Sequence, residues 1–210
     1  MIVLLDTSDA MQECQRDLGD VRIGQLVTPS TGRTLQPDVP FAIDNGAFGK
    51  DGFEADRFIA ILERDKAHQA RCLFVCCPDV VGSARRTSEV FDRWHTRLGA
   101  WKVALVAQDG IENMEVPWDR LDALFIGGST RFKTSDAAQQ VGRAARLLGK
   151  WVHVGRVNTP ERFDAWEWAD SCDGTGVGRY SHMRRSLTSA APLFVAPGPS
   201  PQSGPMSGEK

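Results

Sequence analysis

Polar residues follow several apolar runs of this chain at the points where a buried strand would end. Asp44, Asn45 and Gly46 come directly after "FAI", Asp79 comes after "CLFVCCP", and Gln108 comes after "KVALVA". A single acid at such a point is explained equally well by a turn, because Asp, Asn and Gly are also common turn residues. A whole set of polar strand ends is harder to explain by turns, and it predicts a functional site.

The same pattern continues in the second half of the chain. Gly127 and Gly128 come after "ALFI", Arg156 comes after "WVHVG", and Asp173 lies in "DSCDGTG". Two carboxylates with an amide and bare glycine backbone suit the cleavage or exchange of a glycosidic bond. In that chemistry one carboxylate attacks or stabilises the sugar carbon while the other moves protons. Aspartate, glutamine and backbone groups can also bind the edge of a planar base.

The elements that must position these residues follow from the hydrophobic pattern. Short apolar runs predict strands, and apolar stripes at helical spacing between them predict helices. The predicted strands are 2–6, 41–44, 72–79, 102–108, 123–128 and 151–157, with a weaker one near 171–176 and a further one at 192–196. The predicted helices are 53–70, 83–99, 135–150 and 159–169, the last two capped by Ser135 and Thr159.

Alternating strands and helices predict βαβ units and a parallel sheet. Strands that are apolar almost throughout fit a sheet covered on both faces or a barrel. Seven or eight such units favour an α/β fold of the compact (β/α)8 barrel type. Some of its helices must be short or missing, because the 210 residues fall below the roughly 250 typical of that fold. A doubly wound sheet is the main alternative, and in both folds the functional groups lie at the carboxyl ends of the strands.

Composition bounds the class of protein. We expect one catalytic barrel domain over 1–195 and a disordered tail over 196–210, which is rich in Pro, Gly and Ser. No apolar run approaches the ~20 residues that span a bilayer, and the first residues lack the basic flank of a signal peptide. These features predict a cytoplasmic protein without membrane contact. The net charge of −2 gives no global argument for nucleic acid.

The five cysteines have no metal-type spacing. They are expected to be free thiols in a reducing compartment, and neither a metal nor a cofactor is expected. Cys76 and Cys77 are adjacent on a predicted strand, so their side chains should point to opposite faces.

Five segments, in order along residues 41–176, resemble motifs of the tRNA-guanine transglycosylases. "DNGAF" resembles their DSGGF motif, "VAQDG" their VQGG strand end, and "FIGGST" their GGLAVGE segment. "HVGRVNTPERF" is similar to LMGVGTPEDL, and "DSCDGTG" has the Asp-x-x-Asp spacing of DxFDCVxPTR. The nearer resemblance is to the short transglycosylase-like proteins of phages and bacteria. These include the deazapurine DNA transglycosylases, which insert 7-deazaguanines into DNA.

The resemblance implies a role for each matching residue. Asp44 would be the catalytic acid/base and Asp173 the nucleophile on the sugar. Gln108 and Asp79 would bind the base, although the match at "CPDVV" is loose. The backbone of the glycine pair in "FIGGST" would contact the base as well.

Three further residues are expected to bind substrate beside these. Asn45 and Gly46 adjoin the first aspartate, and Arg156 could meet a phosphate or a base, with a structural ion pair as the alternative. The family's CxCxxC…H zinc subdomain is missing from this chain. Its absence favours DNA over tRNA as the partner and also removes a dimer surface, so we expect a monomer.

Several functions remain open at this point. A second, free base entering the pocket would make the protein a transglycosylase that exchanges guanine for a 7-deazaguanine. Water would instead make it a DNA glycosylase that removes a base, such as a modified base of foreign DNA in antiviral defence. A non-catalytic nucleotide-binding barrel and an enzyme of free nucleosides, either a hydrolase or a phosphoribosyl enzyme, are the alternatives of other classes.

Other residues admit two interpretations. His153 is expected to be a core histidine, Asp170 to be structural and Trp166 to lie in the core, whereas Trp168 could stack on a base if exposed. Three basic side chains are either phosphate contacts or, more commonly, surface charges: Arg131, Lys133 and Arg179.

Overall fold

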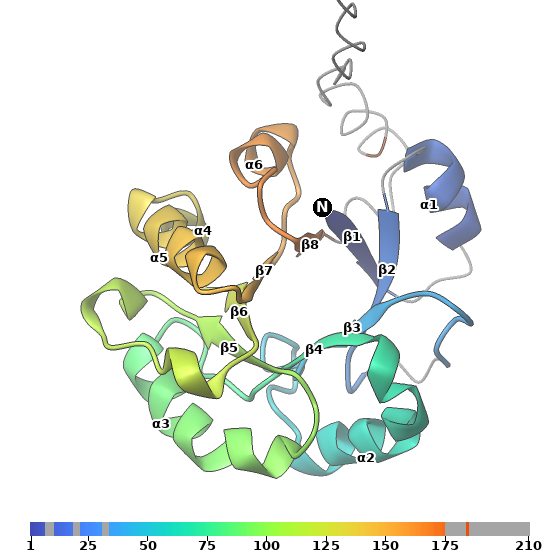
Figure 1. Ribbon diagram of the computed structural model, residues 1–210, viewed down its shortest axis with the longest axis horizontal. Coiled ribbons are helices and arrows are strands. Elements are labelled where there is room, and N and C mark those ends of the chain that lie inside the picture. Colours follow the sequence, from blue (N-terminus) through green and yellow to red (C-terminus); the bar gives the residue numbers. More distant parts are fainter. Residues whose placement is uncertain (7–10, 19–21, 31–33, 175–183, 185–210) are drawn as a thin grey trace, which may run out of the picture.

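The computed structural model describes residues 1–6, 11–18, 22–30, 34–174 and 184. In this part of the chain, eight parallel strands form a closed barrel in sequence order, and β1 pairs with β8 to complete the ring. Figure 1 shows the strands around the centre and the helices outside them. The ring confirms the predicted (β/α)8 barrel and excludes the doubly wound sheet, because such a sheet stays open.

The strands of the barrel are short. They are β1 (Ile2–Asp6), β2 (Arg22–Val27), β3 (Phe41–Ile43), β4 (Cys72–Cys76), β5 (Val103–Ala107), β6 (Ala123–Ile126), β7 (Trp151–Val154) and β8 (Ser171–Asp173). Several predicted strands continued one to three residues too far. Their polar and glycine ends belong to the loops that follow the strands.

One strand was missed. β2 has the sequence "RIGQLV", in which Arg22 and Gln25 interrupt the apolar pattern. Gln25 is nevertheless buried. Its burial is tolerated because both ends of its amide are hydrogen-bonded in the following loop: Nε2 donates to Thr34 O, and Oε1 accepts from Gln36 N. The barrel closes with this strand and without the strand predicted at 192–196, which lies outside the described residues together with the predicted tail.

Helices connect most of the strands. They are α1 (Met11–Leu18), α2 (Ala55–Asp65), α3 (Ala84–Trp94), α4 (Thr130–Lys133), α5 (Asp136–Leu147) and α6 (Pro160–Ala165). Ser135 and Thr159 cap α5 and α6 as predicted, each accepting a backbone N–H of the first turn. Short 3-10 turns supplement them: η1 (Lys66–Arg71), η2 (His95–Leu98), η3 (Ile111–Asn113) and η4 (Trp118–Arg120).

The chain is shorter than a typical barrel because some connections are reduced. Between β5 and β6 the described chain has only the turns η3 and η4, and α6 is a helix of six residues. No helix in the described ranges is long and apolar enough to cross a membrane.

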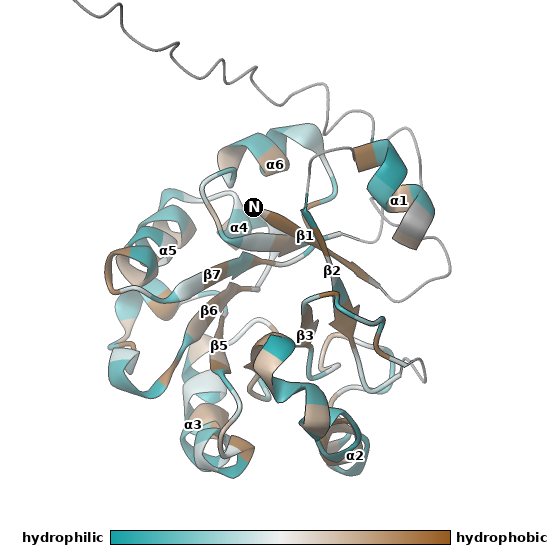
Figure 2. Ribbon diagram, turned by 45° about the vertical axis from the view of Figure 1, so that its right-hand side comes forward, coloured by the Kyte–Doolittle hydropathy of each residue, from teal (hydrophilic) through white to brown (hydrophobic). Residues whose placement is uncertain are grey.

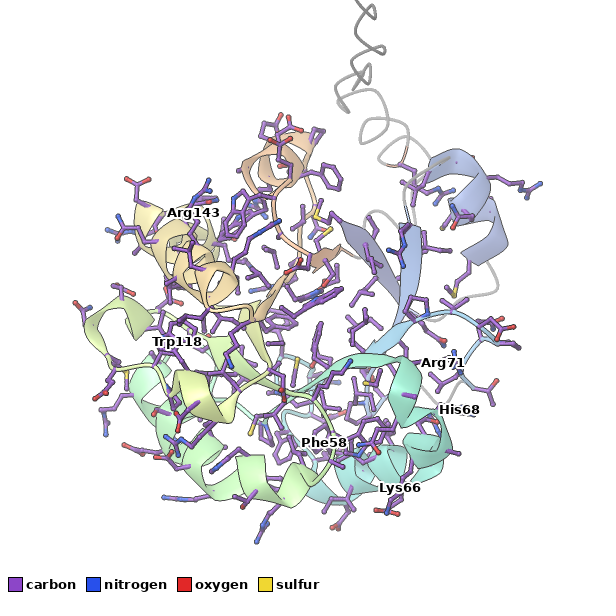
Figure 3. The ribbon with its side chains drawn as sticks, in the orientation of Figure 1. Phe58, Lys66, His68, Arg71, Trp118 and Arg143 are labelled. Atoms are coloured by element: carbon purple, nitrogen blue, oxygen red, sulfur yellow. The ribbon has the colours of Figure 1, made fainter. Side chains whose placement is uncertain are left out.

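Two apolar layers hold the barrel together. The inner layer fills the barrel and includes Leu4, Phe74 and Phe125, and the outer layer lies between the strands and the helices. In Figure 2 strands such as β1 and β6 are mostly hydrophobic, whereas the helices alternate between hydrophobic and hydrophilic residues. Figure 3 places Phe58 of α2 within the outer layer, where it is fully buried. Phe58 packs edge-on against Trp94 at a centroid distance of 6.2 Å.

The cysteines follow the predicted pattern. All five are buried, and Cys72, Cys76, Cys77 and Cys172 are free thiols. Cys76 belongs to the inner layer and Cys77 to the outer layer, which confirms that the adjacent pair points to opposite faces.

Candidate active site

The inward-facing side chains of the strands lead to one pocket at the carboxyl ends. Residues two apart on a strand face the same side, so Asp44 follows inward-facing Ala42, and Gln108 follows inward-facing Val106. The cavity has a volume of about 110 Å³, of the order that holds a single aromatic ring. It is lined by Asp44, Asn45, Phe48, Cys76, Asp79, Val81, Val106, Gln108, Phe125, Gly127, Gly128, Lys133, Gly155, Arg156 and Asp173.

The pocket therefore unites eight of the nine residues predicted from the sequence. The exception is Gly46, which lies behind Asp44 and donates its backbone N–H to Asp44 Oδ1 at 2.7 Å. Within the described part of the chain, no His, Cys, Asp and Glu side chains gather into a set of three or more that could hold a metal.

Asp44 is the acid with the clearest perturbation. Its pKa is raised from 3.8 to about 6, chiefly by burial; the nearby charges of Asp173 and Asp79 act in the same direction, and the hydrogen bond from Gly46 N opposes the shift. Near neutral pH this carboxyl group can therefore both hold and release a proton, as a general acid or base must.

Asp173 is fixed by donors on both of its oxygens. Arg156 N donates to Oδ1 at 3.0 Å, and His153 Nε2 lies 3.0 Å from Oδ2. Behind the imidazole, His153 Nδ1 lies 2.9 Å from Ser171 Oγ, which accepts from Trp151 Nε1 at 2.8 Å. Because the indole can only donate, the Ser171 hydroxyl is free to donate to Nδ1. With Nδ1 accepting from this hydroxyl, the imidazole can donate from Nε2 to Asp173.

His153 was predicted to be a core histidine, and it is fully buried inside the barrel. Its ring lies between Phe74 and Phe125, at centroid distances of 5.0 and 4.5 Å. The contact with Asp173 was not predicted. The period-two pattern gives the only sequence signal for it, since His153 and Gly155 share the inner face of one strand.

Asp79 is held within an amide network. Asn45 Nδ2 donates to Asp79 Oδ1 at 2.8 Å and to Cys77 O at 2.8 Å, and Gln108 Nε2 donates to Asp79 Oδ2 at 2.5 Å. Gln108 Oε1 in turn accepts from Gly82 N at 2.8 Å. Burial raises the pKa of Asp79, and the two amide hydrogen bonds partly offset this effect. Asn45 and Gln108 thus position Asp79 and one another.

Arg156 connects three walls of the pocket. Its backbone adopts φ +59°, a left-handed conformation that is unusual for a residue other than glycine. Its guanidinium donates to Gly128 O at 2.7 Å and lies 3.9 Å from the centroid of the Phe48 ring. Phe48 is 62% exposed at the rim of the pocket. Sequence reasoning missed Phe48, although it ends the "DNGAF" segment.

Glycine at position 155 keeps the floor of the pocket open. A Cβ atom there would lie 2.7 Å from the Phe125 ring and 3.5 Å from Asp173 Oδ2. Any larger residue must displace the aromatic ring or crowd the carboxylate.

The remaining candidates separate clearly. Asp170 is structural, as predicted, because it accepts a hydrogen bond from Val152 N at 2.8 Å. Trp166 is buried, as predicted, whereas Trp168 packs against Trp166 and the Arg143 guanidinium and does not line the pocket. Arg131 is exposed, Arg179 lies outside the described residues, and Lys133 is buried against the pocket instead of being a surface charge.

Comparisons with known proteins bear on the fold alone. No protein-family model and no curated protein matches the chain. One similar solved structure is phosphoribosyl anthranilate isomerase from Thermus thermophilus, with 14% identity, a TM-score of 0.47, and coverage of 90% of this chain and 96% of that chain. Another is Haloferax volcanii malate synthase in a lead(II) complex, with 10% identity, a TM-score of 0.49, and coverage of 98% and 74%. The resemblance to transglycosylases is not tested by these matches and stays a prediction.

Proposed function

We propose that this protein is an enzyme that cleaves the base–sugar N-glycosidic bond in DNA by means of two aspartates. The observation that supports it most directly is that Asp44 and Asp173 line the same pocket, which is of the size of an aromatic ring. They belong to the first and the last of the five sequence motifs. One of these acids has a raised pKa, and the other is fixed by two donors. Two carboxyl groups in such different environments suit an acid and a nucleophile.

In the proposed reaction the target nucleotide leaves the base stack and places its base in the pocket. Asp44 protonates the departing base, and Asp173 attacks C1′ or stabilises the positive charge that develops on the sugar. His153 and the Arg156 N–H keep the Asp173 carboxylate oriented. The backbone of the Gly127–Gly128 segment and the amide network of Asp79 provide hydrogen-bonding groups for the base edge.

The rim of the pocket supports a polymer substrate. Phe48 and Val81 are both exposed beside the pocket, and an aromatic ring in such a place can stack on a nucleobase. One face of Phe48 is covered by the Arg156 guanidinium, which leaves the other face for a base. A free nucleoside has no neighbouring base to occupy that position.

The species that attacks C1′ next determines the product. A free 7-deazaguanine in the same pocket gives base exchange with an intact strand, which is the outcome that the sequence resemblance favours. Water gives an abasic site and makes the protein a DNA glycosylase. Both outcomes need the same two aspartates.

The test is mass spectrometry of bases released from DNA, with and without an added 7-deazaguanine base. Unmodified plasmid and phage DNA with hypermodified cytosines are the substrates, and alkali-labile sites are counted in each. Guanine release coupled to uptake of the added base identifies exchange, whereas base release with alkali-labile sites identifies a glycosylase. Asp173→Asn should abolish release and retain DNA binding. A wild-type protein that binds DNA but releases no base would contradict the proposal and favour the non-catalytic barrel.

A further inference from the structure

Lys133 places a primary amine in the wall of the candidate active site. It is only 3% exposed, and it lines the same cavity as Asp44 and Asp173. Among the described residues, no carboxylate oxygen lies within 4.0 Å of its ammonium group. A buried lysine without a close counterion is unusual, because burial of a charge costs free energy unless it is paired. The proposed glycosidic cleavage assigns this amine no role.

The segment that carries Lys133 is firmly anchored. The Asp109 carboxylate accepts hydrogen bonds from the backbone N–H and the hydroxyl of Ser129, and Ser129 Oγ accepts from Phe132 N at the start of α4. On the other side, Lys133 O accepts from the indole of buried Trp166 at 3.1 Å. These contacts hold the Lys133 backbone beside the pocket and reduce the entropy that its amine loses when it reacts.

We propose that Lys133 is a nucleophile that forms an imine with C1′ of an abasic sugar in the pocket, so that the protein also cleaves DNA strands at abasic sites. The inference rests on the proposed function, because it needs the deoxyribose C1′ at this site. The abasic sugar arises when water attacks C1′, or it is already present in damaged DNA.

The environment suits this reaction. A lysine amine becomes a nucleophile when it is desolvated or lies near another cation. The pKa of Lys133 is lowered to about 8, chiefly by burial; the nearby charge of Arg156 acts in the same direction, and that of Asp173 opposes it. A substantial fraction of the amine is therefore neutral at pH 8.

The proposed steps balance without an external oxidant or reductant. The amine adds to the aldehyde carbon of the ring-opened abasic sugar, and the carbinolamine loses water to give an iminium ion. A pocket carboxylate then removes a C2′ proton, and the electron pair expels the 3′ phosphate, which breaks the strand. Water finally hydrolyses the imine and restores the lysine. Asp44 lies in the same pocket and is ionised above about pH 6, so it can accept the C2′ proton.

The experiment uses an oligonucleotide that already carries an abasic site, incubated with the full-length protein at pH 8 in the presence of sodium borohydride. Borohydride reduces an imine to a stable amine, so the expected product is a covalent protein–DNA adduct, visible as a shifted band. Peptide mass spectrometry should locate the adduct on Lys133. Without borohydride, the strand should be cleaved on the 3′ side of the abasic site.

Lys133→Met should lower trapping at least tenfold, whereas Arg131→Met, on the exposed side of the same helix, should leave it unchanged. Thermal unfolding and abasic-DNA binding of both variants show whether Lys133→Met still folds. Mapping of the wild-type adduct decides the question if it does not. No adduct, or an adduct on the Met1 amine at the opposite end of the barrel, would overturn the inference.

The two proposals fail separately. Absence of base release from every intact DNA, together with trapping at Lys133, would refute the glycosidic reaction and retain the lyase. Base release without trapping on the preformed abasic site would refute the lyase reaction and retain the glycosidic reaction.

Discussion

His153 Nε2 lies 3.0 Å from Asp173 Oδ2, and the histidine is buried completely inside the barrel. The imidazole is fixed from behind by Ser171, which is fixed in turn by the Trp151 indole. Together with the Arg156 N–H on Oδ1, this contact fixes the orientation of the carboxylate before any substrate arrives. We infer that His153 is a positioning residue for Asp173.

This role predicts the behaviour of two variants. A hydrogen bond to a charged group contributes about 1.5–3 kcal/mol, so His153→Leu should lower kcat by roughly 10- to 100-fold, with little change in KM. His153→Gln should recover part of this loss, because its amide N–H can donate to the carboxylate. The measurement is base release at several DNA concentrations. Equal losses in the two variants would indicate a packing role only.

The raised pKa of Asp44 predicts a pH profile. If Asp44 protonates the departing base, kcat/KM should fall about tenfold per pH unit above a midpoint of about 6, because only the protonated form is active. Base release measured from pH 5 to 9 gives the profile. A rate that rises with pH through 6 would show that Asp44 acts as a base in the rate-limiting step.

The raised pKa of Asp44 also makes the stability of the protein depend on pH. Its pKa in the folded protein, about 6, lies above the ordinary value of 3.8, so the folded state binds the proton more tightly. The stability that Asp44 contributes is fully present below about pH 4. It is lost as the pH rises through 6, where the buried carboxyl group ionises in the folded protein. Asp44→Asn should therefore raise the free energy of unfolding by up to about 3 kcal/mol at pH 8.

Urea titrations at pH 8 and pH 4 test this effect. At pH 4 the wild type and Asp44→Asn should unfold at nearly the same urea concentration, because both then carry a neutral side chain. Asn can still accept the Gly46 N–H, so that contact does not confound the comparison. A gain in stability that is equal at both pH values would contradict the explanation.

Much of this arrangement was predictable from sequence. The strand–helix alternation gave the barrel, and the polar strand ends gave eight of the nine residues in one place. The pattern failed at β2, because the polar Gln25 satisfies its amide through a loop that has no local sequence signature. His153 was predicted to lie in the core, as it does, and Lys133 to be a phosphate contact or, more commonly, a surface charge. Neither prediction included the contact of His153 with Asp173 or the burial of Lys133 against the pocket, because both depend on the closure of the barrel.

The amide network around Asp79 gives a prediction for structure instead of catalysis. Both of its oxygens accept from amide nitrogens, of Asn45 and of Gln108. Asp79→Asn would place a third amide N–H₂ group against one of these donors and should cost about 1–3 kcal/mol of folding free energy. Chemical denaturation measures it, with Asp119→Asn at an exposed site as the control. A variant as stable as the wild type would show that the hydrogen bonds of Asp79 to Asn45 and Gln108 do not stabilise the fold. Binding of the base would then be the only role left for Asp79.

Phe48 provides a test of the polymer substrate. Because it is 62% exposed, Phe48→Ala should change the free energy of unfolding by less than about 0.5 kcal/mol. If a base stacks on its open face, the loss should be about 1–3 kcal/mol of binding, a roughly 5- to 150-fold increase in the Kd for single-stranded DNA measured by fluorescence anisotropy. Leu147→Ala is the matched control, since Leu147 is 88% exposed on α5 and does not line the pocket. Equal Kd values for the two variants would show that no base stacks on Phe48 when DNA binds. The exposed ring would then no longer favour a polymer over a free nucleoside as the substrate.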